Sequence, residues 1–128
     1  MTLDSSALLA ILFGESGYLD LVDRILAADT PRVGTPTLAE TGMVLTARRK
    51  TSGVRELDAL VGELGVTIVP FTDAHYAEAV RAFQRYGPGR HKAGLNFGDC
   101  LSYAVASLAD DTLLFVGHDF TKTDIPRA

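Results

Sequence analysis

The stretch NFGDCLSYAVASLADDTLLFV, residues 96–116, carries the pattern that decides the fold. It opens with Asn96, a residue type that favours the N-cap of a helix. An apolar stripe at helical spacing follows, formed by Cys100, Leu101, Ala104, Val105 and Leu108. The apolar run from Leu113 to Val116 then predicts a short strand. A capped helix that leads into a short apolar strand is typical of a parallel sheet covered by helices.

The rest of the chain repeats this alternation. Further helices are expected over residues 7–13, 18–26, 35–50 and 57–64, and between a Thr72 cap and Gly87. The last of these carries Tyr76, Val80 and Phe83 on one face. Strands are expected over residues 1–4, 32–34 and 66–69, the last of them buried. The pattern predicts a three-layer α/β domain over residues 1–128, with a central parallel sheet of four or five strands and helices on both faces.

Composition narrows the class of protein. The chain has 128 residues, with 47% hydrophobic and 22% charged residues, close to ordinary globular usage. No apolar run is suited to crossing a membrane, and the N-terminus lacks the pattern of a signal peptide. A single cysteine, Cys100, excludes an intramolecular disulfide and a thiolate zinc site, and fits a reducing cytosol. The net charge of −4 argues against a protein that binds nucleic acid through its overall charge. The argument does not apply to a metal-dependent nuclease, because its acidic residues gather at the metal and are neutralised there.

Four acidic residues stand at the ends of predicted elements. Asp4 and Asp119 follow strands, whereas Glu40 and Asp99 lie near helix N-termini. Each has an ordinary interpretation. Asp4 could cap a helix, and Asp99 could form a capping box with Asn96. Glu40 could be a solvated helix residue, and Asp119 could form a turn.

The combination favours a functional site. In a parallel sheet these positions share one edge, where sites of α/β proteins form. Four carboxylates that converge there repel one another unless a divalent cation lies among them. Because all the ligands are oxygens, Mg²⁺ or Mn²⁺ is expected rather than zinc.

Several segments resemble PIN-domain proteins, specifically the VapC-type toxins of bacterial toxin–antitoxin pairs. They are LDSSALL (3–9), the helix with Glu40, GLNFGDC (94–100), LFVGHDF (114–120) and TDI (123–125). The resemblance implies a PIN-like fold and an endoribonuclease that cuts single-stranded regions of RNA with Mg²⁺ or Mn²⁺. It also implies inhibition by a cognate VapB-type antitoxin, a bacterial cytosolic location and no association with membranes.

The resemblance also assigns residues. It implies that Asp4, Glu40, Asp99 and Asp119 are catalytic, the first three as metal ligands. It further implies that Ser6 orients Asp4 or its water through a hydroxyl hydrogen bond, and that Asn96 fixes the loop before Asp99. His118, beside Asp119, departs from the residues that family members often carry there.

Two other segments carry expectations. The basic connection GPGRHKAG, residues 87–94, is either a solvated loop or a phosphate-contacting arm that uses Arg90, His91 and Lys92. The family resemblance, with the apolar Tyr18 and Leu19 as candidate exposed contacts, predicts a homodimer that has a groove for an antitoxin segment.

Two other classes of function remain open. A non-catalytic PIN-like interaction module would be expected to have lost part of the acidic quartet. A receiver-type phosphoacceptor domain would need an acidic pair after its first strand and an aspartate after a central strand. Here the first strand gives one carboxylate, and Pro70 follows the third strand.

Overall fold

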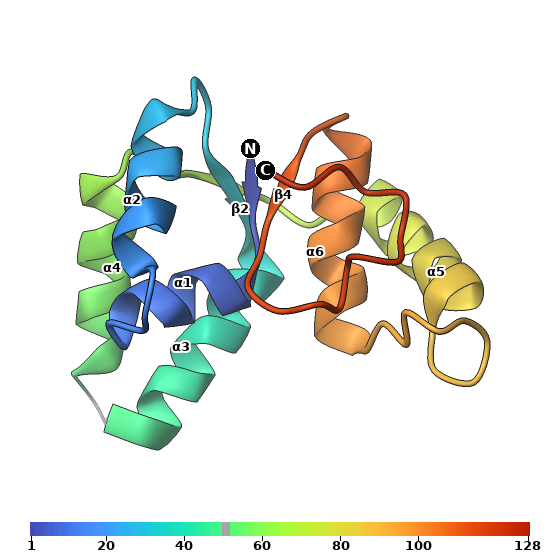
Figure 1. Cartoon of the computed structure of the whole chain (residues 1–128), viewed down its shortest axis with the longest axis horizontal. Helices are drawn as coiled ribbons and strands as arrows, with labels where there is room; N and C mark the ends of the chain where they lie inside the picture. The colour runs from blue at the N-terminus through green and yellow to red at the C-terminus, as the bar shows by residue number, and fades with distance from the viewer. Residues whose placement is uncertain (50–51) are drawn as a thin grey trace.

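The computed structural model describes residues 1–49 and 52–128 (Figure 1). Its elements are, in chain order, β1 (Thr2–Leu3), α1 (Ser5–Leu12), α2 (Tyr18–Ala27), β2 (Arg32–Gly34), α3 (Thr35–Arg49), α4 (Gly53–Glu63), β3 (Thr67–Val69), α5 (Asp73–Tyr86), α6 (Phe97–Leu108) and β4 (Leu113–Leu114). The expected end of the third helix at Lys50 lies outside the described residues. Within the described part of the chain, no helix has the length and apolar character that crossing a bilayer requires.

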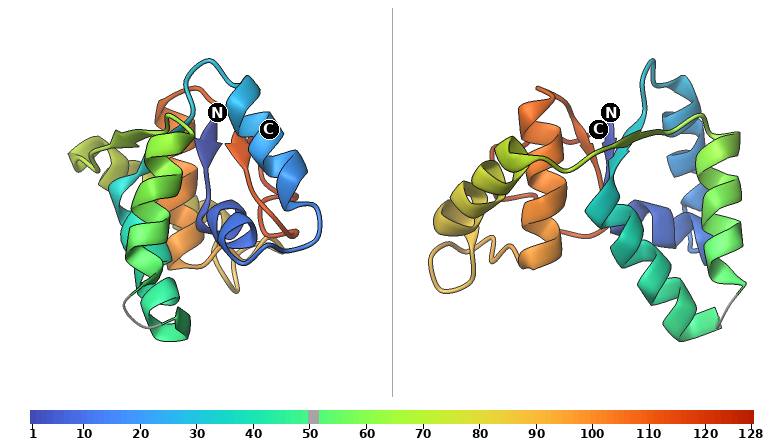
Figure 2. Two further views of the ribbon diagram at one scale, coloured as in Figure 1. Left: turned by 90° about the vertical axis from the view of Figure 1, so that its left-hand side faces the viewer. Right: turned by 180° about the vertical axis from the view of Figure 1, so that it is seen from behind.

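The strands form one parallel sheet in the order β3-β2-β1-β4. Helices α1, α2 and α4 lie on one side of the sheet, and α5 and α6 lie on the other (Figures 1 and 2). Helix α3 starts where β2 ends and packs against α1, α4 and α6. The predicted fold class, a parallel sheet of four or five strands between helical layers, is therefore confirmed.

Each face of the sheet has its own hydrophobic core. Leu3, Leu8, Ile25 and Leu114 belong to the core beneath α1, α2 and α4. Leu113 belongs to the second core, which is shared with α5 and α6. Leu113 and Leu114 fall in different cores because successive side chains of a strand point to opposite faces. Two residues of β4 thus tie both helical layers to the sheet.

The strand predictions need two corrections. The strand at 66–69 is not buried: β3 is an edge strand whose Ile68 is 49% exposed, and an apolar run alone does not distinguish an edge from a centre. Val66 N donates to Val61 O (3.0 Å), so Val66 closes α4 instead of opening the strand. The last strand ends at Leu114 rather than Val116, because Val116 N donates to Ser6 Oγ (3.0 Å).

The apolar stripe of α5 faces outward. Tyr76, Val80 and Phe83 are 66%, 42% and 43% exposed. The buried residues of this helix are Ala79, Ala82 and Tyr86. Small alanine side chains allow α5 to approach α6 closely, which leaves the larger side chains on the outer surface. They form an apolar face together with Phe97 and Leu101, which line the same ≈ 490 Å³ groove.

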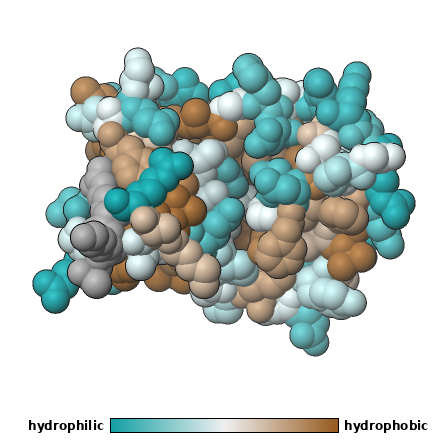
Figure 3. All heavy atoms as spheres, turned by 90° about the horizontal axis from the view of Figure 1, so that it is seen from below, coloured by the Kyte–Doolittle hydropathy of each residue, from teal (hydrophilic) through white to brown (hydrophobic). Residues whose placement is uncertain are grey.

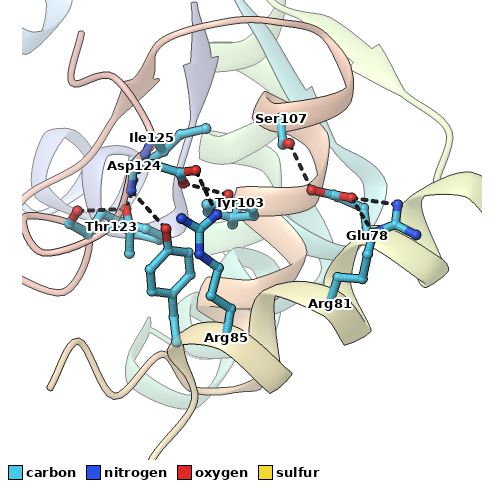
Figure 4. A network of polar contacts seen from close by, with 10 residues as sticks. Glu78, Arg81, Arg85, Tyr103, Ser107, Thr123, Asp124 and Ile125 are labelled. Atoms are coloured by element: carbon cyan, nitrogen blue, oxygen red, sulfur yellow. Dashed lines mark hydrogen bonds and ion pairs between the residues drawn. The ribbon is translucent and has the colours of Figure 1, made fainter. Parts of the chain in front are cut away.

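The C-terminal segment after β4 is pinned by a polar network (Figure 4). The Tyr103 hydroxyl donates to Asp124 Oδ1 (2.6 Å), and Asp124 N donates to the Tyr86 hydroxyl (3.2 Å). Arg85 forms an ion pair with the other oxygen of Asp124 (3.0 Å). Since β4 holds the start of the segment and Asp124 holds its end, the intervening loop with Asp119 is fixed from both sides.

Candidate active site

The four acidic residues singled out in the sequence come from four segments that meet at one edge of the sheet. Asp4 follows β1, Glu40 lies in α3, Asp99 lies in the first turn of α6, and Asp119 lies in the loop after β4. Figure 3 views this edge from below and shows hydrophilic residues lying between hydrophobic ones. The structure therefore brings the segments together as parallel pairing requires.

Asp4 is held in place by the chain that follows it. The residue is 4% exposed, and its Oδ2 accepts hydrogen bonds from Ser6 N (3.0 Å) and Ser6 Oγ (2.6 Å). The hydrogen bond expected from Ser6 is thus present. Asp4 is at the same time the N-cap of α1, so its ordinary interpretation also describes the structure. Because Ser6 Oγ accepts from Val116 N, one serine links Asp4 to the loop that carries Asp119.

Asp99 and Asn96 hold each other at the start of α6. Asp99 N donates to Asn96 Oδ1 and Asn96 N donates to Asp99 Oδ2, each over 2.9 Å. This reciprocal pair is the capping box that the sequence allowed. Its consequence for the site is that Asp99, only 9% exposed, has a fixed orientation at the helix N-terminus.

The electrostatics of Asp99 show that the acidic residues act on one another. Its pKa is raised to about 6, chiefly by burial and against the lowering effect of the backbone hydrogen bond from Asn96. The negative charges of Asp119, Asp4 and Glu40 contribute to this rise in the pKa. The carboxyl groups of Asp119, Asp4 and Glu40 therefore lie within electrostatic reach of Asp99.

Glu40 shares this environment. The residue as a whole is exposed, but its carboxyl group lies against Gly98, and partial burial of this group raises its pKa. The charge of Asp4 raises the pKa as well, whereas a hydrogen bond from the Ser5 side chain lowers it. Glu40 is thus not the freely solvated helix residue of its ordinary interpretation.

Asp119 stands on the exposed side of the site. Its neighbour Phe120 is 2% exposed and packs against Phe115, with ring centroids 5.1 Å apart. Thr121 N donates to His118 O (3.1 Å), which makes a turn around the aspartate. The buried Phe120 anchors the loop, and Asp119 and His118 remain exposed.

The donor set fits a hard divalent cation. The candidate ligands are carboxylate oxygens only, as Mg²⁺ and Mn²⁺ prefer. Among residues 1–49 and 52–128, however, no three Asp, Glu, His or Cys side chains stand close enough to enclose an ion. Since Mg²⁺ commonly keeps several waters and uses one or two carboxylates, water molecules would complete its shell here.

The basic connection leads from α5 into Asn96. Arg90 and Lys92 are exposed on it. His91 is partly buried: its ring meets Tyr86 edge-on (5.1 Å between centroids), and its Nδ1 accepts from Ala93 N (3.0 Å). His91 therefore helps to hold the loop in place, whereas the side chains of Arg90 and Lys92 are accessible to a ligand.

Sequence reasoning missed two residues of the site, Ser5 and Gly98. The Ser5 side chain interacts with Glu40, a residue of another helix, and nothing local in the sequence signals that contact. Gly98 could have been noticed, because a glycine in the first turn of a helix destabilises the helix and commonly indicates close packing or a functional role.

The chain is similar to known proteins over nearly its whole length. The family model described as "PIN domain" matches residues 1–126. The protein named Ribonuclease VapC36 of Mycobacterium tuberculosis is 45% identical over 126 residues, which cover 98% of this chain and 91% of that protein. Ribonuclease VapC of Mycolicibacterium smegmatis is 43% identical over 127 residues, with 98% and 97% covered.

Solved structures share the fold at low sequence identity. Mycobacterium tuberculosis VapC20, described as a Sarcin-Ricin loop cleaving toxin, superposes with a TM-score of 0.79 at 17% identity, covering 99% of this chain and 97% of that one. A toxin-antitoxin complex from Klebsiella pneumoniae contains a chain with a TM-score of 0.74 at 14% identity, covering 96% and 92%.

Proposed function

The chain belongs to the PIN-domain family, and from this premise we propose that it is a metal-dependent endoribonuclease, the toxin of a bacterial toxin–antitoxin pair. The observation that carries the proposal is the raised pKa of Asp99 beside the charges of Asp119, Asp4 and Glu40. Groups so perturbed at one edge of a sheet are typical of functional sites. Relatives that are named ribonucleases align over nearly the whole chain, which supports the same activity here.

Asp4, Glu40 and Asp99 would hold Mg²⁺ or Mn²⁺, some of them through bound water, because no three such side chains in the described part of the chain stand close enough to enclose an ion directly. Asp119 would complete the acidic site. When bound, the cation supplies neutralisation of phosphate charge and a nucleophilic water at neutral pH. The residues of the chain supply orientation. Ser6 fixes the Asp4 carboxylate, and the backbone N–H of Asn96 fixes the Asp99 carboxylate, so that both are oriented before a substrate binds.

The proposed substrate is a single-stranded region of RNA in the bacterial cytosol. Exposed Arg90 and Lys92 lie on the connection that enters α6, the helix of Asp99, and suit contacts to phosphates that flank the cleaved bond. Their positive charges make this segment locally basic, although the chain as a whole has a net charge of −4.

The proposed protein partners are a VapB-type antitoxin and a second copy of the chain. Antitoxin binding is supported by the toxin-antitoxin complex among the structural neighbours. Of the two residues first suggested as dimer contacts, Leu19 is 62% exposed and Tyr18 is partly buried. The apolar face of Tyr76, Val80 and Phe83 offers a larger surface, and exposed apolar patches of this kind mark protein contacts.

The direct test is cleavage of single-stranded RNA by the purified protein with chelator and with Mg²⁺ or Mn²⁺ restored. Cleavage should stop in chelator and return with either ion, and Glu40→Gln should remain inactive in both conditions. Metal-independent cleavage would contradict the proposed chemistry. Absence of any cleavage, by a protein that still binds its antitoxin, would favour the non-catalytic interaction module.

A further inference from the structure

Gly98 lies directly beneath the carboxyl group of Glu40. A Cβ atom built on Gly98 would stand 2.7 Å from Oε1 and 2.9 Å from Oε2 of Glu40. Both distances are shorter than real contacts of Cβ atoms. The Glu40 carboxyl group therefore occupies the space that the Cβ atom of any residue other than glycine would need at position 98.

The backbone gives no other reason for this glycine. Gly98 is not among the glycines with positive φ, which are Gly14, Gly17, Gly65, Gly89, Gly94 and Gly117. It lies inside α6, where alanine is intrinsically more favourable than glycine. What the missing side chain provides at this position is room for Glu40.

The room has an electrostatic effect. The first turn of a helix attracts negative charge through its backbone N–H groups. Glu40 carries the same negative charge as its neighbours Asp4 and Asp99, so its approach to both is unfavourable without a cation. Contact with the start of α6 offsets part of this repulsion and keeps the carboxyl group near Asp99.

We propose that Gly98 is a positioning residue, whose absent side chain lets the Glu40 carboxyl lie beside Asp99 where a divalent cation binds. The proposal rests on the function proposed above. A methyl group at position 98 meets only the far end of a flexible side chain. The Glu40 carboxyl can therefore swing away at little cost, and the fold survives while the site is disrupted.

The test is Gly98→Ala, with Gly62→Ala as a matched control. Gly62 lies in α4, where a Cβ would meet nothing within 4 Å. In chelator, both variants should melt at or above the wild-type temperature, because alanine is the better helix former. The Mn²⁺ concentration that gives half of the thermal shift should rise about 10- to 100-fold for Gly98→Ala alone, and its cleavage rate should fall in parallel.

Shortening Glu40 provides a rescue. In the double variant Gly98→Ala, Glu40→Asp, the carboxyl group retreats by one methylene, so Mn²⁺ should bind more tightly than to Gly98→Ala. The two substitutions should therefore be non-additive, as expected of groups in contact. A purely structural defect would lower the melting temperature in chelator and would not respond to Glu40→Asp.

A metal-free measurement separates this proposal from the proposed function. Glu40→Gln should shift the backbone amide NMR signals of residues 97–99 in the wild-type background, and much less in the Gly98→Ala background. Equal shifts in both backgrounds, or a Mn²⁺ midpoint unchanged by Gly98→Ala, would overturn the proposal. If the wild type shows neither cleavage nor a Mn²⁺ response, the proposed function is wrong, and the NMR comparison alone decides the placement of Glu40.

Discussion

Asp4 has two tasks that one substitution can separate. It caps α1 by accepting hydrogen bonds from Ser6, and it contributes charge to the acidic site. Asparagine caps about as well as aspartate, so Asp4→Asn should keep the cap. In chelator we expect stability equal to wild type or higher by about 1 kcal/mol, since repulsion among the carboxylates is relieved. RNA cleavage and toxicity should be lost.

The measurement is thermal unfolding with chelator and with excess Mn²⁺, beside a cleavage assay. Mn²⁺ should stabilise the wild type more than Asp4→Asn, because an ion that binds only the folded state stabilises according to its affinity. Asp4→Ala is the control, since loss of the cap should cost about 1 kcal/mol in either condition. Normal cleavage by Asp4→Asn would show that Asp4 is not part of the active site.

Asp99 makes stability depend on pH. Its pKa in the folded protein is about 6, above the ordinary value of 3.8 for an aspartate, so between these two values the folded state holds a proton that the unfolded state releases. In chelator, the free energy of unfolding should therefore fall as pH rises from about 4 to about 6, by about 1.4 kcal/mol per pKa unit. Urea unfolding over this range measures the slope. Asp99→Asn should flatten it, and an unchanged slope would contradict the assignment.

At the residue scale, the sequence located what stands at element ends and missed what depends on tertiary contact. Asp4 and Asp99 were predictable because a cap position and a strand end are local features. The contact of Glu40 with Gly98 joins α3 to α6 and depends on how these helices pack. Periodicity within a single helix contains no information on that packing.

The C-terminal segment is the element whose anchoring is easiest to test. Tyr103→Phe removes the hydroxyl that donates to Asp124 and should cost about 1 kcal/mol in urea unfolding. Arg85→Ala breaks an exposed ion pair with the same Asp124 and should cost less. Tyr103→Phe should also slow cleavage, because the loop with Asp119 loses part of its support. Equal costs for the two variants would mean that the buried hydroxyl is not the main anchor.

The connection between α5 and α6 has a separate test. Replacing Arg90 and Lys92 by alanine should weaken RNA binding and reduce the slope of log affinity against log salt concentration, because each phosphate contact contributes to that slope. Fluorescence anisotropy over a salt series measures it. Arg55→Ala, which removes an exposed cation from α4 on the other side of the sheet, is the control. An unchanged slope would favour a merely solvated loop.

The order and type of the helices and strands were predictable, but which of their faces are buried was not always predictable. The strand at 66–69 was expected to be buried, yet β3 has a single neighbour, β2. Strand order decides this, and one apolar run does not reveal it. On α5, the stripe of large apolar residues faces outward, because the alanines on the other side pack against α6. The largest side chains did not mark the core face.

At the scale of the whole molecule, two surfaces compete for the second copy of the chain. Tyr76 on α5 and Leu19 on α2 are 66% and 62% exposed, so glutamate substitutions at the two positions can be compared directly. If the apolar face of α5 makes the dimer, Tyr76→Glu should yield monomers in sedimentation at micromolar concentration and Leu19→Glu should not. The reverse result would place the contact on α2, and a monomeric wild type would contradict the dimer.

The strand order also sets a sequence of events during synthesis. Of the four strands, β1 emerges from the ribosome before the others, yet one of its two neighbours is β4, the last of the four to be made. Until Leu113 and Leu114 have been made, β1 has an open edge and Asp119 does not yet exist. Because a domain folds as a unit once its parts are present, a ribosome-bound fragment cannot assemble the acidic site. A cell that translates this chain is therefore exposed to the proposed activity only after residues 113–119 have been made.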